Sequence, residues 1–285
     1  MKEKKPGKPE FPKKFDGFSQ YRPPLSFDLL GRSFTCVMDS GYDYVLKFTD
    51  EKKLSFKEAG KRAKSYAYEC LKCDDRTYFV NFELTGSNPR CGLSVVLDLE
   101  QDLTTFVFAW TGLNPKLPKL PSTSIVFGAV LKEDGTLAER RHGYTADLTG
   151  LAIHWYYSTM EVVHVYTSER YYRIALPQSF LDKMAAKGTP IEDGGPSLVH
   201  FFEEPANYVK IKDGIYLLSF VEEQMHRELG AGGSMLYLMD LNRMHDVGRG
   251  FGIGFDGRPE NYTFGAFGEP VEHELMDKPS YYWIR

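Results

Sequence analysis

Residues 154–173, HWYYSTMEVVHVYTSERYYR, concentrate side chains that could bind or transform a small molecule. The stretch combines phenol and indole rings with two histidines and two arginines, and apolar and polar residues alternate along most of it. Residues two apart on a strand face the same side, so Trp155 and Tyr157 should point together. Val162, His164 and Tyr166 should share a face in the same way. We therefore expect a pocket lined by aromatic rings, with His164 able to act as an acid or base near neutral pH.

The elements that must position these residues are short β-strands. Runs rich in Tyr, Phe, Val and Thr are separated by Gly, Asp, Asn and Pro, which favours an antiparallel all-β fold. The strand pattern also occurs twice. Residues 31–41 correspond to 150–160, 74–84 to 212–222, and the segment from Gly92 to that from Gly233, in the same order. A sheet of seven or eight strands with one apolar face removes its edges by closing into a barrel.

The predicted fold is thus two tandem lipocalin-like (calycin-type) antiparallel β-barrels that arose by internal duplication, with a few short helices such as 178–188. Residues 1–26 are expected to form a flexible, basic, Pro-rich tail, and 27–116 the first barrel. Residues 117–146 would be a bridging segment, and 147–285 the second barrel with a C-terminal extension. At the positions of Trp155 and Tyr157 the first copy has Cys36 and Met38. This asymmetry makes the second barrel the expected ligand site.

Composition narrows the function classes. The net charge of −4 argues against a nucleic-acid partner, and no apolar run approaches the roughly 18–20 residues of a membrane helix. The N-terminus has lysines but no apolar signal region, so we expect a cytoplasmic protein. Cys70 and Cys73 form a C-x-x-C, which leaves a metal or redox site as the alternative to buried reduced thiols. The glycine run 248–254 is followed by no helix signal, which disfavours a phosphate loop. We expect neither metal nor cofactor.

The order of RHGYTADLTG, HWYYS, HVYTSERYY and IKDGIYLLSFVE resembles the MoaF family, named for molybdenum-cofactor biosynthesis protein F. The resemblance extends from about Phe27 to Phe255 and implies an accessory role in that metabolism.

The second repeat also resembles bacterial phenolic acid decarboxylases, which are single lipocalin-like barrels without a cofactor. Residues 155–163, 171–174 and 212–220 match three of their motifs. The resemblance implies that Tyr157 and Arg173 grip a substrate and that Asp213 replaces a proton-handling glutamate. Trp155 replaces the first of two tyrosines, and Asp213 is one methylene shorter than glutamate. These departures favour a pocket for a phenolic or planar small molecule over decarboxylation itself.

Two functions follow from these residues. The first is a cofactor-independent lyase or isomerase acting on a small phenolic compound, with Tyr157, Arg173, Asp213 and His164 as its catalytic residues. A guanidinium inside a barrel needs an anion, which is either Asp213 or a ligand carboxylate or phenolate. The expected ligand contacts are Trp155, Tyr166, Tyr172 and Tyr216.

The alternative is a non-catalytic barrel that binds a small aromatic molecule, or an accessory factor. For each of these side chains a packing role also stays open, and Arg173 with Asp213 could be a structural ion pair. The expected partner is a small aromatic molecule, with neither nucleic acid nor membrane, and a homodimer remains an open alternative.

Overall fold

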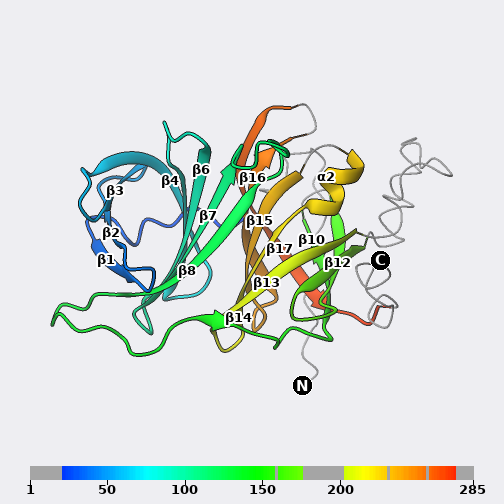
Figure 1. Ribbon diagram of the computed structural model, residues 1–285. Helices are drawn as coiled ribbons and strands as arrows, with labels where there is room; N and C mark the ends of the chain where they lie inside the picture. The colour runs from blue at the N-terminus through cyan, green and yellow to red at the C-terminus, as the bar shows by residue number, and fades with distance from the viewer. Residues whose placement is uncertain (1–20, 158–159, 176–201, 230–231, 255–256, 274–285) are drawn as a thin grey trace, which may run out of the picture.

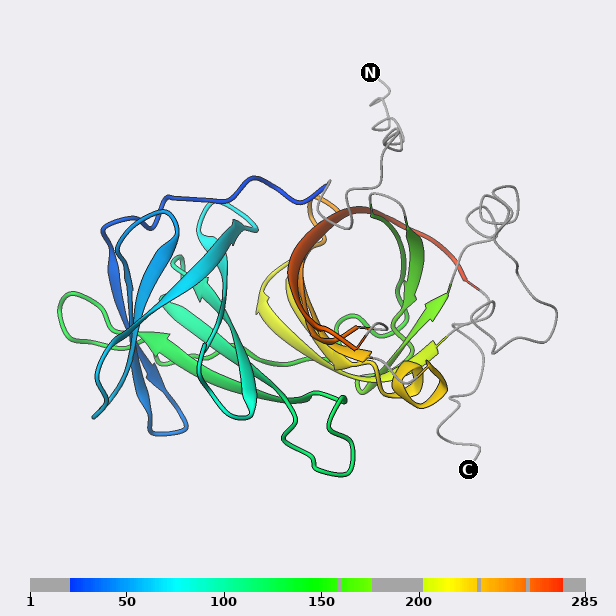
Figure 2. The same cartoon turned by 90° about the horizontal axis from the view of Figure 1, so that it is seen from above.

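The computed structural model describes residues 21–157, 160–175, 202–229, 232–254 and 257–273. These residues build two closed antiparallel β-barrels in tandem, each of eight strands, with little helix (Figure 1). The strands of the second barrel form a ring in Figure 2. The predicted fold class is confirmed.

The first barrel joins its strands in chain order and closes by pairing the last with the first. These are β1 (Ser33–Met38), β2 (Asp43–Phe48), β3 (Lys53–Glu58), β4 (Lys64–Lys72), β5 (Thr77–Glu83), β6 (Arg90–Asp98), β7 (Leu103–Thr111) and β8 (Ser122–Val130).

The second barrel repeats that order and closes between its first and last strands. Its members are β10 (Ala152–Tyr156), β11 (Glu161–Val165), β12 (Tyr171–Ala175), β13 (Phe202–Lys212), β14 (Ile215–Val221), β15 (Gly232–Asp240), β16 (His245–Ile253) and β17 (Pro259–Pro270). The two-residue strand β9 (Gly143–Tyr144) pairs with β13, and α2 (Glu223–Leu229) joins β14 to β15.

A matching turn in both barrels supports the duplication. After β6, Asp98 Oδ1 accepts hydrogen bonds from two backbone N–H groups, and after β15 Asp240 Oδ1 does the same. Four residues after each aspartate the backbone enters the left-handed region, at Asp102 with φ 56° and at Met244 with φ 49°. Because few non-glycine residues adopt positive φ, the shared position indicates one turn design used twice.

The barrels pack side against side. Apolar residues on the outer faces of β4–β7 and β13–β16 form one buried cluster, which includes Phe79, Val107, Leu217 and Val247. The guanidinium of Arg249 enters the first barrel's sheet and donates to Leu93 O at 2.8 Å. It also donates to the backbone oxygen of Phe82 and to the side chains of Ser94 and Asn261. This apolar and hydrogen-bonded contact fixes one barrel against the other.

Two expected boundaries are wrong. The bridging segment 117–146 contains β8, because a barrel needs an eighth strand to close against β1. Residues 21–26, expected in the flexible tail, instead lie along both barrels (Figure 2). There Arg22 forms an ion pair with Glu69 of the first barrel at 3.1 Å and a hydrogen bond with Thr263 of the second. The expected helix 178–188 and the rest of the tail lie outside the described residues. No helix in the described ranges is long and apolar enough to cross a membrane.

Candidate functional site

The interior of the second barrel is lined mainly by aromatic rings. Alternation along β10 turns Ile153, Trp155 and Tyr157 inward, and all three are buried in one cluster. The predicted common face of Trp155 and Tyr157 is therefore confirmed. Other members of the cluster are Tyr166, Tyr172, Tyr208, Tyr216, Phe220, Tyr237 and Phe264.

His164 lies at the centre of these rings. It pairs with Ile153 across the β10–β11 ladder and therefore also points inward. Its ring lies edge-to-face with those of Trp155, Tyr172 and Tyr237, at centroid distances of 6.5, 5.2 and 5.1 Å. Burial among apolar edges disfavours the charged imidazolium and lowers the pKa of His164 to about 3. His164 is therefore neutral at physiological pH, and the expected acid–base role near neutral pH is not supported.

The same interior also holds a buried acid–phenol pair. Tyr157 donates its hydroxyl hydrogen to Asp246 Oδ2 at 3.0 Å, and both side chains are buried. Asp246 is on β16 and turns inward because its ladder partner Ala266 belongs to the interior cluster. Burial raises the pKa of Asp246 to about 8, although the hydrogen bond from Tyr157 opposes the shift. Desolvation and the carboxylate together raise the pKa of Tyr157 well above its usual value.

Four polar atoms of this interior make no hydrogen bond of normal geometry among the described residues. They are Trp155 Nε1, His164 Nδ1, Tyr172 Oη and Asp246 Oδ1. A buried polar group without a partner is costly, and nearly all such groups in proteins are paired with protein, water or ligand. Donors and acceptors alternate with flat apolar surface here, which is the composition of a small-molecule site.

Arg173 lies on the outside of the barrel, so its expected place in the pocket is wrong. Its neighbour Tyr172 points inward, and adjacent residues of a strand face opposite sides. Arg173 instead pairs with Val165 and Glu203 on the outer face and donates to Glu203 Oε1 at 3.3 Å. Both charged side chains are fully buried, as a structural ion pair.

Asp213 is also far from its expected place. It lies in the turn between β13 and β14, where its side chain is 99% exposed and pairs with Lys210 at 2.9 Å. Tyr216 is nearby, at the same end of the barrel, and its hydroxyl donates to Asp147 at 3.1 Å. The structure therefore brings together Trp155, Tyr157, His164, Tyr166 and Tyr172 from the expected site, and leaves out Arg173 and Asp213. The role of the interior residues as ligand contacts stays a prediction.

Asp246 is not among the predicted site residues, although its strand carries a signal. Asp246, Gly248, Gly250 and Gly252 alternate with Val247, Arg249 and Phe251, so one face of β16 is small. A Cβ at Gly248 would lie 2.1 Å from the Phe264 ring, and one at Gly250 would lie 2.4 Å from the Tyr262 ring. These glycines make room for inward rings, and no phosphate loop is formed. The lone acid on such a face was the clue to a buried carboxyl.

The first barrel lacks this chemistry at equivalent positions. Register places Thr104 of β7 where the second barrel has Asp246, since Leu97 and Met239 are their respective ladder partners. Thr104 is satisfied by donating to Val96 O at 2.9 Å. Cys36 and Met38 fill the places of Trp155 and Tyr157 and belong to the first barrel's core. The acid–phenol pair is therefore a feature of the second barrel.

The C-x-x-C pair is divided between two environments. Cys70 packs in the core of the first barrel, whereas Cys73 packs in the cluster between the barrels. Both thiols are free and buried, and burial raises the pKa of Cys70 to about 12. The spacing therefore does not bring the two sulfurs to one site.

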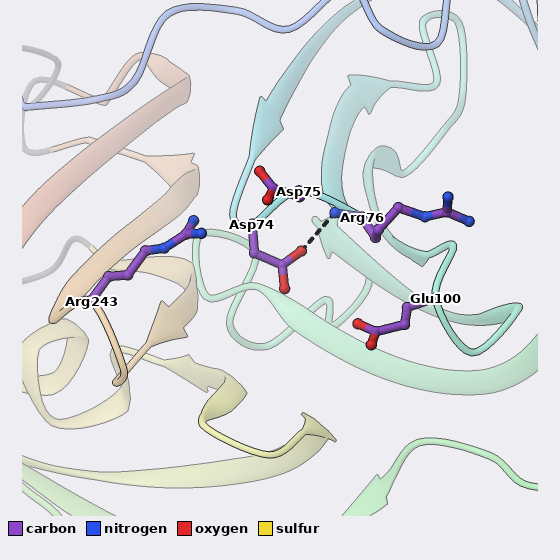
Figure 3. Close-up of a pocket in the computed structure, with 5 residues that line it drawn as sticks. All are labelled: Asp74, Asp75, Arg76, Glu100 and Arg243. Atoms are coloured by element: carbon purple, nitrogen blue, oxygen red, sulfur yellow. Dashed lines mark hydrogen bonds between the residues drawn. The ribbon is translucent and has the colours of Figure 1, made fainter.

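A charged hollow of about 470 Å³ lies where turns of the two barrels meet (Figure 3). Its lining residues are Asp74, Asp75, Arg76, Glu100 and Arg243. Lys212 reaches Asp74 and Glu100 at 2.6 Å each, and Arg243 lies 3.7 Å from Asp240. Since most of these charges already have partners, the hollow is an ionic junction between the barrels and a weaker candidate than the second-barrel interior.

Comparison with known proteins gives one family. Residues 15–111 match the model described as the MoaF N-terminal domain, and this range includes strands β1–β7 of the first barrel. A search of curated proteins found no match. A MoaF domain together with a barrel fold fits a small-molecule-binding or accessory role. The resemblance to phenolic acid decarboxylases remains a prediction. The resemblance to the MoaF family is confirmed for residues 15–111, which match the model of its N-terminal domain.

Proposed function

We propose that the second barrel binds a small planar aromatic molecule in its interior. The observation that carries the proposal is the group of unpartnered polar atoms on Trp155, His164, Tyr172 and Asp246. All four side chains are fully or almost fully buried, and the rings of Trp155 and Tyr172 both contact His164. A ligand whose polar atoms reach these groups would give them hydrogen-bond partners and stack against the surrounding rings.

The binding role is better supported than a decarboxylase-like lyase. Decarboxylation as implied by the resemblance needs Arg173 and an acid at Asp213 beside Tyr157. Arg173 is held outside the barrel by Glu203, and Asp213 is exposed at a turn. A second candidate, an isomerase that uses Asp246 as its acid or base, is favoured by the hydrogen bond from Tyr157 and by a pKa of about 8.

Methionine methyl groups allow binding to be located. Met235 and Met239 lie in the interior of the second barrel, whereas Met38 lies in the core of the first. Protein labelled with ¹³C at the methionine methyls should be titrated with benzyl alcohol and indole. We expect the Met235 and Met239 signals to shift with saturation, while the Met38 signal stays in place. Unchanged Met235 and Met239 signals with every aromatic compound would refute the proposal.

The same titration separates binding from catalysis. Compounds that shift these signals should be incubated with the protein and followed by proton NMR, including solvent deuterium exchange into the ligand. Exchange that is lost in Asp246→Asn would favour the isomerase. Saturable binding without exchange or turnover would favour the carrier.

A further inference from the structure

The ionisable groups at the inward positions of the second barrel, apart from tyrosine and histidine, are mainly carboxyl groups. Asp246 on β16 and Glu204 on β13 are fully buried, and the ladder partners of both point inward. Glu222 comes directly after β14 and continues the alternation that turns Leu218 and Phe220 inward. Its Oε2 accepts a hydrogen bond from Gly233 N. Three carboxyl groups therefore belong to the interior or to the end of the barrel where α2 joins β14 to β15.

Cations are almost missing from the same surface. In the strands that the structure describes, Lys210 is the one lysine or arginine at an inward position. Lys210 lies at the end of the barrel that carries the β13–β14 turn, where its half-exposed amine forms ion pairs with Asp147 at 3.0 Å and Asp213 at 2.9 Å. Arg173 and Arg249 both point outward, to Glu203 and to the first barrel. An anionic ligand would find no free cation among the described inward residues.

The rings around Asp246 suit a cation as well. Tyr157, Tyr166 and Tyr237 are the titratable neighbours that the carboxyl affects; they lie directly after β10, directly after β11 and on β15. Phe264 on β17 lies 5.0 Å from Tyr237 and 5.7 Å from Tyr157. Faces of such rings attract ammonium groups and nitrogen-containing cations. His164, which lies among the same rings, is neutral and adds no opposing charge.

We infer that the ligand of the second barrel is an organic cation, an aromatic compound carrying a protonated amine, with its nitrogen at Asp246 Oδ1. This inference rests on the proposed function and reverses the ligand charge that the decarboxylase resemblance implies. Asp246 Oδ1 is unpartnered and buried, so an ammonium group gives it a charge-assisted hydrogen bond. Tyr157 holds the other oxygen and thereby sets the direction of the carboxyl.

The test is a matched series of benzylamine, benzyl alcohol and benzoate, titrated against the Met235 and Met239 methyl signals. We expect benzylamine to bind about tenfold more tightly than benzyl alcohol, the change that one charge-assisted hydrogen bond supplies, and benzoate to bind most weakly. In Asp246→Asn the ratio of amine to alcohol affinity should fall to about one. In Asp213→Asn, which changes an exposed carboxyl outside the barrel, the ratio should stay at its wild-type value.

A second measurement avoids reliance on the folding of a core variant. Benzylamine that binds wild-type protein at pH 7 should release a proton, because the ammonium group favours ionised Asp246. Calorimetry in buffers of different ionisation enthalpy measures that release. Binding of benzyl alcohol or benzoate without preference for the amine, or amine binding without proton release, would overturn the inference and leave the proposed function standing. If none of the three moves the Met235 and Met239 signals, both fail.

Discussion

Replacing Asp246 with asparagine should remove a large part of the pH dependence of stability. Burial places the folded-state pKa of Asp246 at about 8, against an ordinary value of 3.8. Between these values the folded protein holds a proton that the unfolded chain has released. The free energy of unfolding therefore falls as pH rises through this window and levels off above pH 8.

The magnitude follows from the size of the pKa difference. Each pH unit inside the window costs about 1.4 kcal/mol for one group, so the wild type should lose roughly 4 kcal/mol between pH 5 and pH 8 from Asp246 alone. Asparagine has nearly the same shape and can still accept the hydrogen bond from Tyr157, but it does not titrate. The free energy of unfolding of Asp246→Asn, relative to that of the wild type, should therefore increase by roughly 4 kcal/mol between pH 5 and pH 8.

Urea unfolding at pH 5, 6, 7 and 8, followed by circular dichroism, measures this difference. Glu222, whose pKa burial raises to about 7, contributes equally to both proteins, so the difference profile isolates Asp246. Asp213→Asn is the control, because that side chain is exposed, and its profile should run parallel to the wild type within about 1 kcal/mol. A constant difference between Asp246→Asn and the wild type across the range would refute the reasoning.

Three further substitutions test other contacts by urea unfolding. Tyr157→Phe removes the donor to Asp246 and should cost roughly 1–3 kcal/mol at pH 8, whereas an unchanged value would mean that the hydrogen bond does not form. Arg249→Leu removes the buried guanidinium between the barrels and should cost about 3 kcal/mol or more, so a loss below 1 kcal/mol would contradict its bridging role. Gly248→Ala places a Cβ against a ring of β17 and should cost about 1–3 kcal/mol, while Gly143→Ala, which meets no atom within 4 Å, should stay within about 0.5 kcal/mol.

The sequence was sufficient for the fold because each strand signal is local. Alternation and turn residues marked the strands, and the repeated order predicted two barrels rather than one large sheet. The exception is β8, because its residues lie in the segment 117–146 that the sequence pattern predicts as a bridge. Closure of the barrel, a non-local requirement, decides the fate of that segment.

The site was predicted in part, and the errors have physical causes. Trp155 and Tyr157 are predicted to face the same side because they are two residues apart on a strand, and both point inward in the structure. The resemblance predicts Arg173 inside together with Tyr172, but neighbours on a strand face opposite sides, so only Tyr172 points inward. Asp213 precedes Gly214, a turn signal that predicts exposure.

Asp246 was missed for a different reason. Its partner Tyr157 is 89 residues away in sequence, and only the closed barrel brings the two together. The alternation of side chains along β16 predicts that Asp246 lies on the inward face, but it does not predict which phenol lies beside it.

A crystal structure of the full chain grown with benzylamine tests the central claim most directly. We predict one benzylamine inside the second barrel, with its amine within hydrogen-bond distance of Asp246 Oδ1 and its ring against Tyr237 or Phe264. A second-barrel interior that holds only side chains and water at saturating benzylamine, with the compound bound elsewhere or not at all, would contradict the account.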